Sequence, residues 1–291
     1  MTLTRRAVLL ASAGMVSACT LNPDRDHLGA DAPREAPLRK PVRTAWVFSS
    51  GGPRGFTHIG VLKALAQLGL KPDLIVGASV GALVGSLCAA GLSADAVETL
   101  ALELQPMRLA RLALGQQERL SGAAVAELVR QYAPVTLLEQ MPIPMACVAA
   151  RRRDGVAVPF TAGDAGLAVQ AAAAIEGQFA PVRIRGEQYL DADWSTPLPV
   201  RIARALGAQR VLAVDASVHV DRSPSGAARY RESDLRKKLL IDADAAVADL
   251  VVKPDFGYWV NVSRDFRERA IEAGYREALS QEAALRTLHR L

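Results

Sequence analysis

The stretch Leu74-Ile75-Val76-Gly77-Ala78-Ser79-Val80-Gly81-Ala82-Leu83 decides how this chain is built. It begins as an apolar run typical of a buried strand, and after Gly-Ala-Ser-Val-Gly it continues in a pattern typical of a helix, as far as Ala90. In this strand–turn–helix context G-x-S-x-G places a serine at a sharp, strained turn, with its hydroxyl above the strand ends. Gly77 and Gly81 let the strand and helix pass close together. The pattern predicts Ser79 as a nucleophile; the alternative is a glycine-rich turn with a capping serine.

A second glycine-rich turn lies upstream, at Ser50-Gly51-Gly52-Pro53-Arg54-Gly55. A strand pattern over residues 43–49 leads into it, and apolar residues at helical spacing follow as far as Gly69. Such a turn presents backbone N–H groups in a concave nest that suits an anion. It has neither the spacing of a dinucleotide site nor the Gly-Lys-Ser/Thr of a P-loop. His58, one turn into the helix, is expected to pack or hydrogen-bond rather than to act as a base.

Both turns resemble motifs of the patatin-like phospholipases. In that family a Gly-Gly-Gly-x-Arg/Lys-Gly loop precedes G-x-S-x-G, and an Asp-Gly-Gly/Ala motif stands before a Pro-Val. Here the third motif is Asp191-Ala192-Asp193, followed by Leu198-Pro199-Val200. The resemblance extends from about Thr44 to about residue 280 and implies a patatin-like three-layer sandwich.

The resemblance also implies a serine hydrolase that cleaves acyl esters of lipids with a Ser–Asp dyad and no cofactor. Ser79 would be the nucleophile, and Asp191 would orient and activate it without a histidine between them. The backbone amides of Gly51 and Gly52 would hold the oxyanion, and Arg54 would fix the loop or add positive charge. The chemistry is consistent, because a hydroxyl needs an adjacent base and an oxyanion needs fixed donors.

Three residues depart from the family pattern. Ser50 replaces the first glycine of the loop, which could displace one backbone donor. Ala192 replaces the glycine after the aspartate, where a positive φ would strain it by roughly 1 kcal/mol or more. Glu176 stands where the family usually has proline. Asp193 is expected to be a solvated or loop-capping carboxylate rather than the base.

Strand and helix patterns alternate along the rest of the chain. This alternation predicts an α/β fold with a mainly parallel central sheet and helices on both faces. Sites in such sheets lie at the carboxyl ends of strands, where Ser79 and the Gly-Gly turn both fall. Half of the 291 residues are apolar, enough for a large core in one domain.

The first residues are expected to lie outside this domain. Arg5 and Arg6 precede an apolar run at 7–18 that is too short for a membrane span and has the length of a signal peptide core. The run ends at Val16-Ser17-Ala18-Cys19, which resembles a bacterial lipoprotein signal. That resemblance implies a signal peptide at 1–18, a lipidated Cys19 on a tether at 19–42, and a hydrolase domain at 43–291. The expected location is the bacterial cell envelope, and Thr20 favours the outer membrane. His27, within the tether, is expected to be solvated.

Composition excludes several other classes. The net charge of +5 comes without an aromatic-interleaved basic stripe, so no nucleic-acid partner is expected. Three cysteines make no disulfide framework, and scattered histidines without a carboxylate cluster make a metal site improbable. Residues 104–120 form a basic amphipathic stretch that is either a core-packed helix or a lip touching anionic lipid.

Two other functions stay open. One is a Ser–Asp–His esterase that uses His219 or His289, although no loop signal surrounds either histidine. The other is a non-catalytic envelope-binding lipoprotein that keeps the fold. The leading prediction is a membrane-anchored enzyme whose partners are a phospholipid or other acyl-ester substrate and the bacterial membrane.

Overall fold

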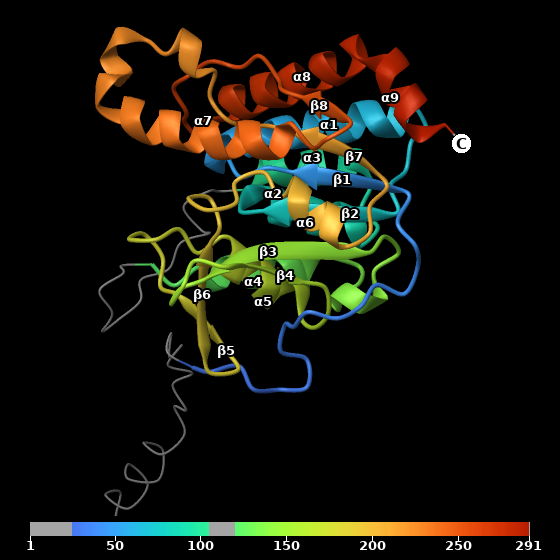
Figure 1. The fold of residues 1–291 in the computed structure, drawn as a ribbon, viewed down its shortest axis with the longest axis vertical. Helices are drawn as coiled ribbons and strands as arrows, with labels where there is room; N and C mark the ends of the chain where they lie inside the picture. The colour runs from blue at the N-terminus through green and yellow to red at the C-terminus, as the bar shows by residue number, and fades with distance from the viewer. Residues whose placement is uncertain (1–24, 105–119, 291) are drawn as a thin grey trace, which may run out of the picture.

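A computed structural model of the chain describes residues 25–104 and 120–290. The expected signal peptide, Cys19 and most of the 104–120 stretch lie outside these residues. The described part forms an α/β fold around one eight-stranded sheet (Figure 1). Its strands are β1 (Thr44–Phe48), β2 (Leu74–Ala78), β3 (Met145–Arg151), β4 (Ala157–Phe160), β5 (Val182–Ile184), β6 (Glu187–Asp191), β7 (Arg210–Val214) and β8 (Leu250–Val252).

Most strand pairs in the sheet are parallel, as the sequence predicts. Hydrogen-bonded neighbours follow the order β5-β6-β3-β2-β1-β7-β8, and β4 also pairs with β3. The pairs that join β8, β7, β1, β2 and β3 are parallel, whereas β4 and β6 run antiparallel to β3. The mainly parallel sheet is therefore confirmed.

The central strands are buried on both faces. Trp46 and Phe48 of β1 belong to one apolar cluster, whereas Ala45 and Val47 belong to the other. This alternation follows from the period of two along a strand. Both faces must consequently be covered by helices.

The helices cover the two faces unequally. On one face α1 (Phe56–Gln67), α2 (Val80–Ala89) and α5 (Ala165–Ala172) contribute to the larger cluster; α3 (Ala94–Glu103) and α8 (Arg264–Ser280) pack on α1, and α4 (Ala123–Tyr132) packs on α5. On the other face α6 (Val200–Ala205) covers the strands and α7 (Arg231–Ala245) packs on α6. The last helix is α9 (Glu282–His289). In Figure 1 α6 lies in front of the sheet and α5 behind it.

Two glycines allow α1 and α8 to approach closely. A Cβ at Gly60 would lie 1.8 Å from the carbonyl oxygen of Ile271, and one at Gly274 would lie 2.0 Å from that of Thr57. Because these neighbours are backbone atoms, no side-chain movement could relieve the overlap. The contact fixes α8 against the first turns of α1, next to the Gly-Gly turn.

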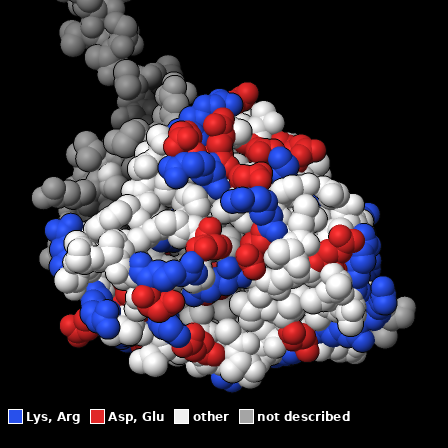
Figure 2. All heavy atoms as spheres, turned by 90° about the horizontal axis from the view of Figure 1, so that it is seen from above, with Lys and Arg blue, Asp and Glu red and all other residues white. Residues whose placement is uncertain are grey.

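The charges on the outer helices are interspersed. The face seen in Figure 2 carries basic and acidic side chains side by side rather than in one block. On α8 this mixture includes the ion pairs Arg264–Glu268, Arg269–Asp265 and Arg276–Glu272. These pairs at i,i+4 support the helix and use much of the basic charge locally.

Residues 26–41 differ from the expected tether. The N–H of His27 donates to the carbonyl of Arg183 at 3.1 Å, that of Arg34 to Ala162 at 2.9 Å, and Ala32 is buried. His27 is partly buried, which lowers its pKa, rather than solvated. The segment thus lies against the domain. None of the helices in the described ranges has both the length and the apolar character needed to span a membrane.

Candidate active site

Ser79 sits at a strained turn between β2 and α2. Its φ of 54° and ψ of −126° lie in a region that residues with a Cβ rarely adopt. A Cβ at Gly77 would lie 2.4 Å from the carbonyl oxygen of Gly81, and a Cβ at Gly81 would lie 2.3 Å from that of Phe48. Both glycines are therefore required for the close crossing of strand and helix, as the sequence motif implies.

The register of β3 brings Asp191 to Ser79. Residue Ala78 of β2 pairs with Val148, and Asp191 of β6 pairs with the next residue, Ala149. Strand β4 pairs with residues 147–150 of β3 and so occupies one edge of β3 along the stretches that pair with β2 and with β6. Strands β2 and β6 must therefore lie one after the other along the opposite edge of β3. Strand β2 ends just before Ser79, and β6, which runs in the opposite direction, ends at Asp191. Ser79 and Asp191 therefore meet end to end.

The Asp191 carboxyl is buried beside the Ser79 hydroxyl. Burial raises its pKa to about 7, while hydrogen bonding by Ser79 lowers it and the charge of Asp193 raises it. Oδ1 accepts the backbone N–H of Asp193 at 2.8 Å, and the buried Oδ2 accepts no well-formed hydrogen bond. The Ser79 contact is thus close enough to affect the carboxyl but not yet a short hydrogen bond. Such contacts often tighten only when substrate binds.

The Gly-Gly turn presents two unused backbone donors. Within the described residues, no acceptor takes the N–H of Gly51 or of Gly52. Gly52 has a φ of 52° and lines the same cavity as Ser79. The N–H of Ser50, in contrast, donates to the carbonyl of Pro197 at 2.8 Å. The backbone of Ser50 therefore holds the turn in place, and its N–H is not available to the site.

His58 hydrogen-bonds to the residue that precedes the Gly-Gly turn. Its Nε2 lies 2.9 Å from the carbonyl oxygen of Ser49, and its Nδ1 is buried without a partner. Burial lowers the pKa of His58 to about 4, so the ring is neutral and donates through Nε2. It is a hydrogen-bonding residue, as expected.

Arg54 ties the turn to a distant loop. Its guanidinium donates to the carbonyl oxygens of Gly257 at 2.6 Å and Tyr258 at 2.8 Å. The backbone N–H of Arg54 also donates to Gly51 at 3.1 Å. The side chain is buried, which lowers its pKa. Arg54 therefore fixes the turn from both its backbone and its side chain.

An apolar cavity of about 240 Å³ opens beside Ser79. Gly52 and Ser79 lie at its polar end. Its walls come mainly from α1, α2, α3 and α4 and include Ile59, Leu83, Leu87, Val97, Leu100 and Leu128. A cavity of this chemistry can hold a hydrocarbon chain and cannot hold a charged group without loss of hydration.

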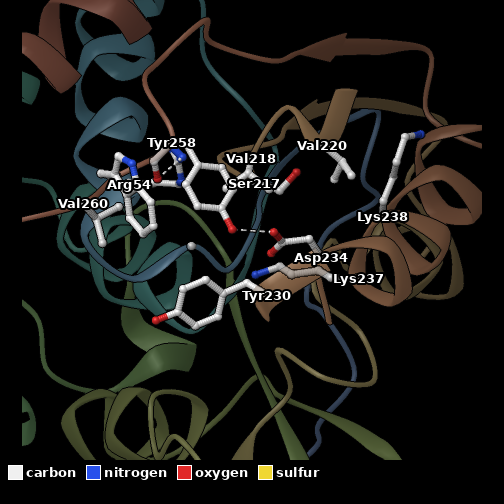
Figure 3. A pocket seen from close by; sticks show the side chains of 12 residues that line it. Arg54, Ser217, Val218, Val220, Tyr230, Asp234, Lys237, Lys238, Tyr258 and Val260 are labelled. Atoms are coloured by element: carbon white, nitrogen blue, oxygen red, sulfur yellow. Dashed lines mark hydrogen bonds between the residues drawn. The ribbon is translucent and has the colours of Figure 1, made fainter. Parts of the chain in front are cut away.

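A second cavity, of about 310 Å³, lies against the other part of the turn (Figure 3). Gly51 and Arg54 line it together with residues of α7 and of the loop after β8. There the Tyr258 hydroxyl donates to Asp234 at 2.6 Å. No motif in the sequence pointed to this loop, although the aromatic run Phe256-Gly257-Tyr258-Trp259 is unusual in so aromatic-poor a chain.

The other residues singled out from the sequence lie elsewhere. The ring nitrogens of His289 contact Trp46 and Leu285, and those of His219 contact Pro254 and Arg222, so neither faces Asp191. Asp193 pairs with Lys237. Ala192 does not have a positive φ, so the strain considered for it is absent. Within 25–104 and 120–290, no three His, Cys, Asp or Glu side chains gather as metal ligands.

Comparisons with known proteins show the family to which the chain is related. A family model described as patatin-like phospholipase matches residues 46–204. An uncharacterized NTE family protein of Mycobacterium tuberculosis is 32% identical over 201 residues, which is 68% of this chain and 54% of that protein. Lysophospholipase NTE1 of Mycosarcoma maydis is 28% identical over 223 residues, 69% of this chain and 11% of the relative. The crystal structure of VipD from Legionella pneumophila has the same fold, with a TM-score of 0.59 and 12% identity over 87% of this chain and 70% of that one. The chain thus spans about half of the mycobacterial relative.

Proposed function

Because this chain belongs to the patatin-like phospholipase family, we propose that it cleaves acyl esters of phospholipids with Ser79 as nucleophile and Asp191 as base. The observation that carries the proposal is the end-to-end meeting of Ser79 and Asp191 beside an apolar cavity. Membership of the family supports hydrolysis of a lipid ester, and the cavity favours an ester whose acyl part is a long hydrocarbon chain.

The proposed reaction proceeds in two halves. Ionised Asp191 accepts the proton of the Ser79 hydroxyl while Oγ attacks the ester carbonyl. The N–H groups of Gly51 and Gly52 stabilise the tetrahedral oxyanion, which collapses and expels the alcohol; the alcohol takes the proton from Asp191. Water, deprotonated by Asp191, then attacks the acyl-serine, and the fatty acid leaves as Ser79 regains its proton. A base with a pKa of about 7 suits both proton transfers near neutral pH.

The two alternatives make different predictions for the same assays. A Ser–Asp–His esterase needs His219 or His289, so His219→Ala or His289→Ala would abolish hydrolysis. A binding lipoprotein would neither react with a fluorophosphonate at Ser79 nor release fatty acid. The contacts of the two histidines favour the dyad, because both rings hydrogen-bond to groups other than Asp191.

The decisive experiment is lipid analysis after incubation with defined phospholipids. We expect the wild type to release fatty acid, both histidine variants to keep most of that activity, and Ser79→Ala and Asp191→Asn to lose it. Fluorophosphonate labelling of Ser79 in folded protein checks the nucleophile independently. Release of fatty acid by Ser79→Ala would refute the assignment.

We also propose that the chain is anchored in a bacterial envelope membrane by lipidation of Cys19. The support is the sequence of residues 5–19 alone. Metabolic labelling with an alkyne fatty acid should mark the wild type and leave Cys19→Ser unmarked. Equal labelling of both proteins, or labelling of neither, would remove the anchor from the proposal.

A further inference from the structure

Large apolar side chains are exposed in the loop after β8. Trp259, Val260 and Val262 are 53%, 45% and 42% exposed within four consecutive positions. A single exposed apolar residue is ordinary, whereas such a group is unfavourable in water unless something covers it. We name residues 259–262 the rim segment.

The rim segment meets the apolar cavity beside Ser79 at Val262, whereas Trp259 and Val260 line the second cavity. Val262 is also exposed at the surface. Val262 therefore joins the exposed apolar side chains of the segment to the apolar wall of the cavity beside Ser79.

The rim segment is held in a defined position relative to the Gly-Gly turn. Arg54 binds the carbonyl oxygens of Gly257 and Tyr258, immediately before the segment. The Tyr258 hydroxyl binds Asp234 of α7, and the Trp259 ring contacts Tyr230 edge-to-face with centroids 6.4 Å apart. Figure 3 shows Arg54, Tyr258 and Tyr230 around the second cavity. These contacts hold the backbone in place, while the apolar tips remain exposed.

We propose that the rim segment is the surface that seats this protein on a phospholipid bilayer, with Trp259 in the interfacial region. Trp suits this layer because its ring is amphipathic. Seating would remove exposed apolar area from water and set the cavity mouth against the acyl chains. This inference rests on the proposed function, since it assumes that the substrate lies in a bilayer.

A spectroscopic test places Trp259 directly and needs no catalysis. The full chain carrying Ser79→Ala and Trp194→Phe retains Trp259 and the buried Trp46. Vesicles of brominated phosphatidylcholine and phosphatidylglycerol should quench its fluorescence, and vesicles without bromine should not. Adding Trp259→Phe to this variant should remove the quenching, even where another part of the chain binds the vesicle. Equal quenching with and without Trp259, or no quenching, overturns the proposal.

A kinetic test uses two rim variants and a matched control. Trp259→Ala and Val260→Ser should lose about ten- to hundredfold in hydrolysis of vesicle phospholipid, the loss expected when one large apolar side chain is no longer buried. Hydrolysis of a soluble short-chain ester should change by less than about twofold. The control is Leu28→Ser: Leu28 is 67% exposed and lies beside β5, at the other end of the sheet from β8, so this variant should match the wild type on both substrates.

The outcomes separate the two proposals. Rim variants that match the wild type on vesicles, or that lose both substrates equally, refute the bilayer surface. A wild type that cleaves neither substrate refutes the proposed function instead, and the quenching result then decides the bilayer surface alone.

Discussion

Asp193 acts on Asp191 in two opposing ways. Its backbone N–H donates to Oδ1 of Asp191 at 2.8 Å and lowers the pKa of that carboxyl, whereas its own charge raises it. Lys237, which pairs with Asp193, lowers the same pKa. Burial outweighs these effects and leaves the Asp191 pKa at about 7.

Activity should therefore rise with pH and reach half its maximum near pH 7, because in the proposed reaction only ionised Asp191 accepts the Ser79 proton. Asp193→Asn should move this midpoint to lower pH, and Lys237→Gln should move it to higher pH. The measurement is kcat/KM on a soluble ester from about pH 5 to 9. A profile that stays flat over this range contradicts the role of Asp191.

Asp191→Asn should be inactive but more stable than the wild type at high pH. A carboxyl whose folded-state pKa is raised binds its proton more tightly in the folded state, so its ionisation reduces stability as pH rises from 3.8 to about 7. Above pH 7 the variant should gain at most about 4 kcal/mol in the free energy of unfolding, and at pH 4 almost nothing. Urea unfolding at both pH values measures this. A gain that does not depend on pH would contradict the buried, titrating carboxyl.

The strain at Ser79 should appear as a difference between two inactive variants. Ser79→Gly tolerates a φ of 54°, whereas Ser79→Ala keeps the unfavourable Cβ. We expect Ser79→Gly to exceed Ser79→Ala by roughly 1 kcal/mol in the free energy of unfolding, after the greater unfolded-state entropy of glycine is included. Thermal unfolding of the pair checks this, and an equally stable Ser79→Ala would mean that the turn relaxes.

Arg54→Lys should lower kcat roughly ten- to hundredfold with little effect on KM. A lysine ammonium cannot reproduce the planar fork that reaches the carbonyl oxygens of Gly257 and Tyr258. The Gly51 and Gly52 donors would then be less well fixed where the oxyanion forms. The matched control is Arg222→Lys, an exposed pair with Asp255 in the same region. If kcat falls as much in Arg222→Lys as in Arg54→Lys, the effect comes from the loop after β8 and not from the Gly-Gly turn.

Gly274→Ala should destabilise the fold by more than about 2 kcal/mol, because its Cβ would overlap the backbone of Thr57 on α1. At Gly226 the nearest atom to such a Cβ is 3.7 Å away, so Gly226→Ala should change stability little. Chemical unfolding compares the two. Equal stability would show that α8 can move away from α1.

Local motifs predicted the parts of the site that depend on local geometry. Gly77, Gly81 and Ser79 indicate a sharp turn, because a strand and a helix that cross so closely leave room only for small residues. The loop that carries Trp259 could not be predicted, since Arg54 reaches Gly257 and Tyr258 across about 200 positions of sequence. Residues 26–41 look like a linker because they lack periodicity, yet backbone hydrogen bonds to Arg183 and Ala162 hold them in place. Such bonds leave no pattern in side chains.

The shared edge of β3 also determines which changes in the chain leave Ser79 and Asp191 side by side. The separation of Ser79 and Asp191 is set by the adjacent partners Val148 and Ala149, and the length of chain between the two strands does not enter. Insertions in the intervening loops can therefore accumulate without moving the Ser79 and Asp191 side chains apart. A slip of β6 by a single residue, in contrast, would turn the Asp191 carboxylate, together with every other side chain of β6, to the opposite face of the sheet and away from Ser79.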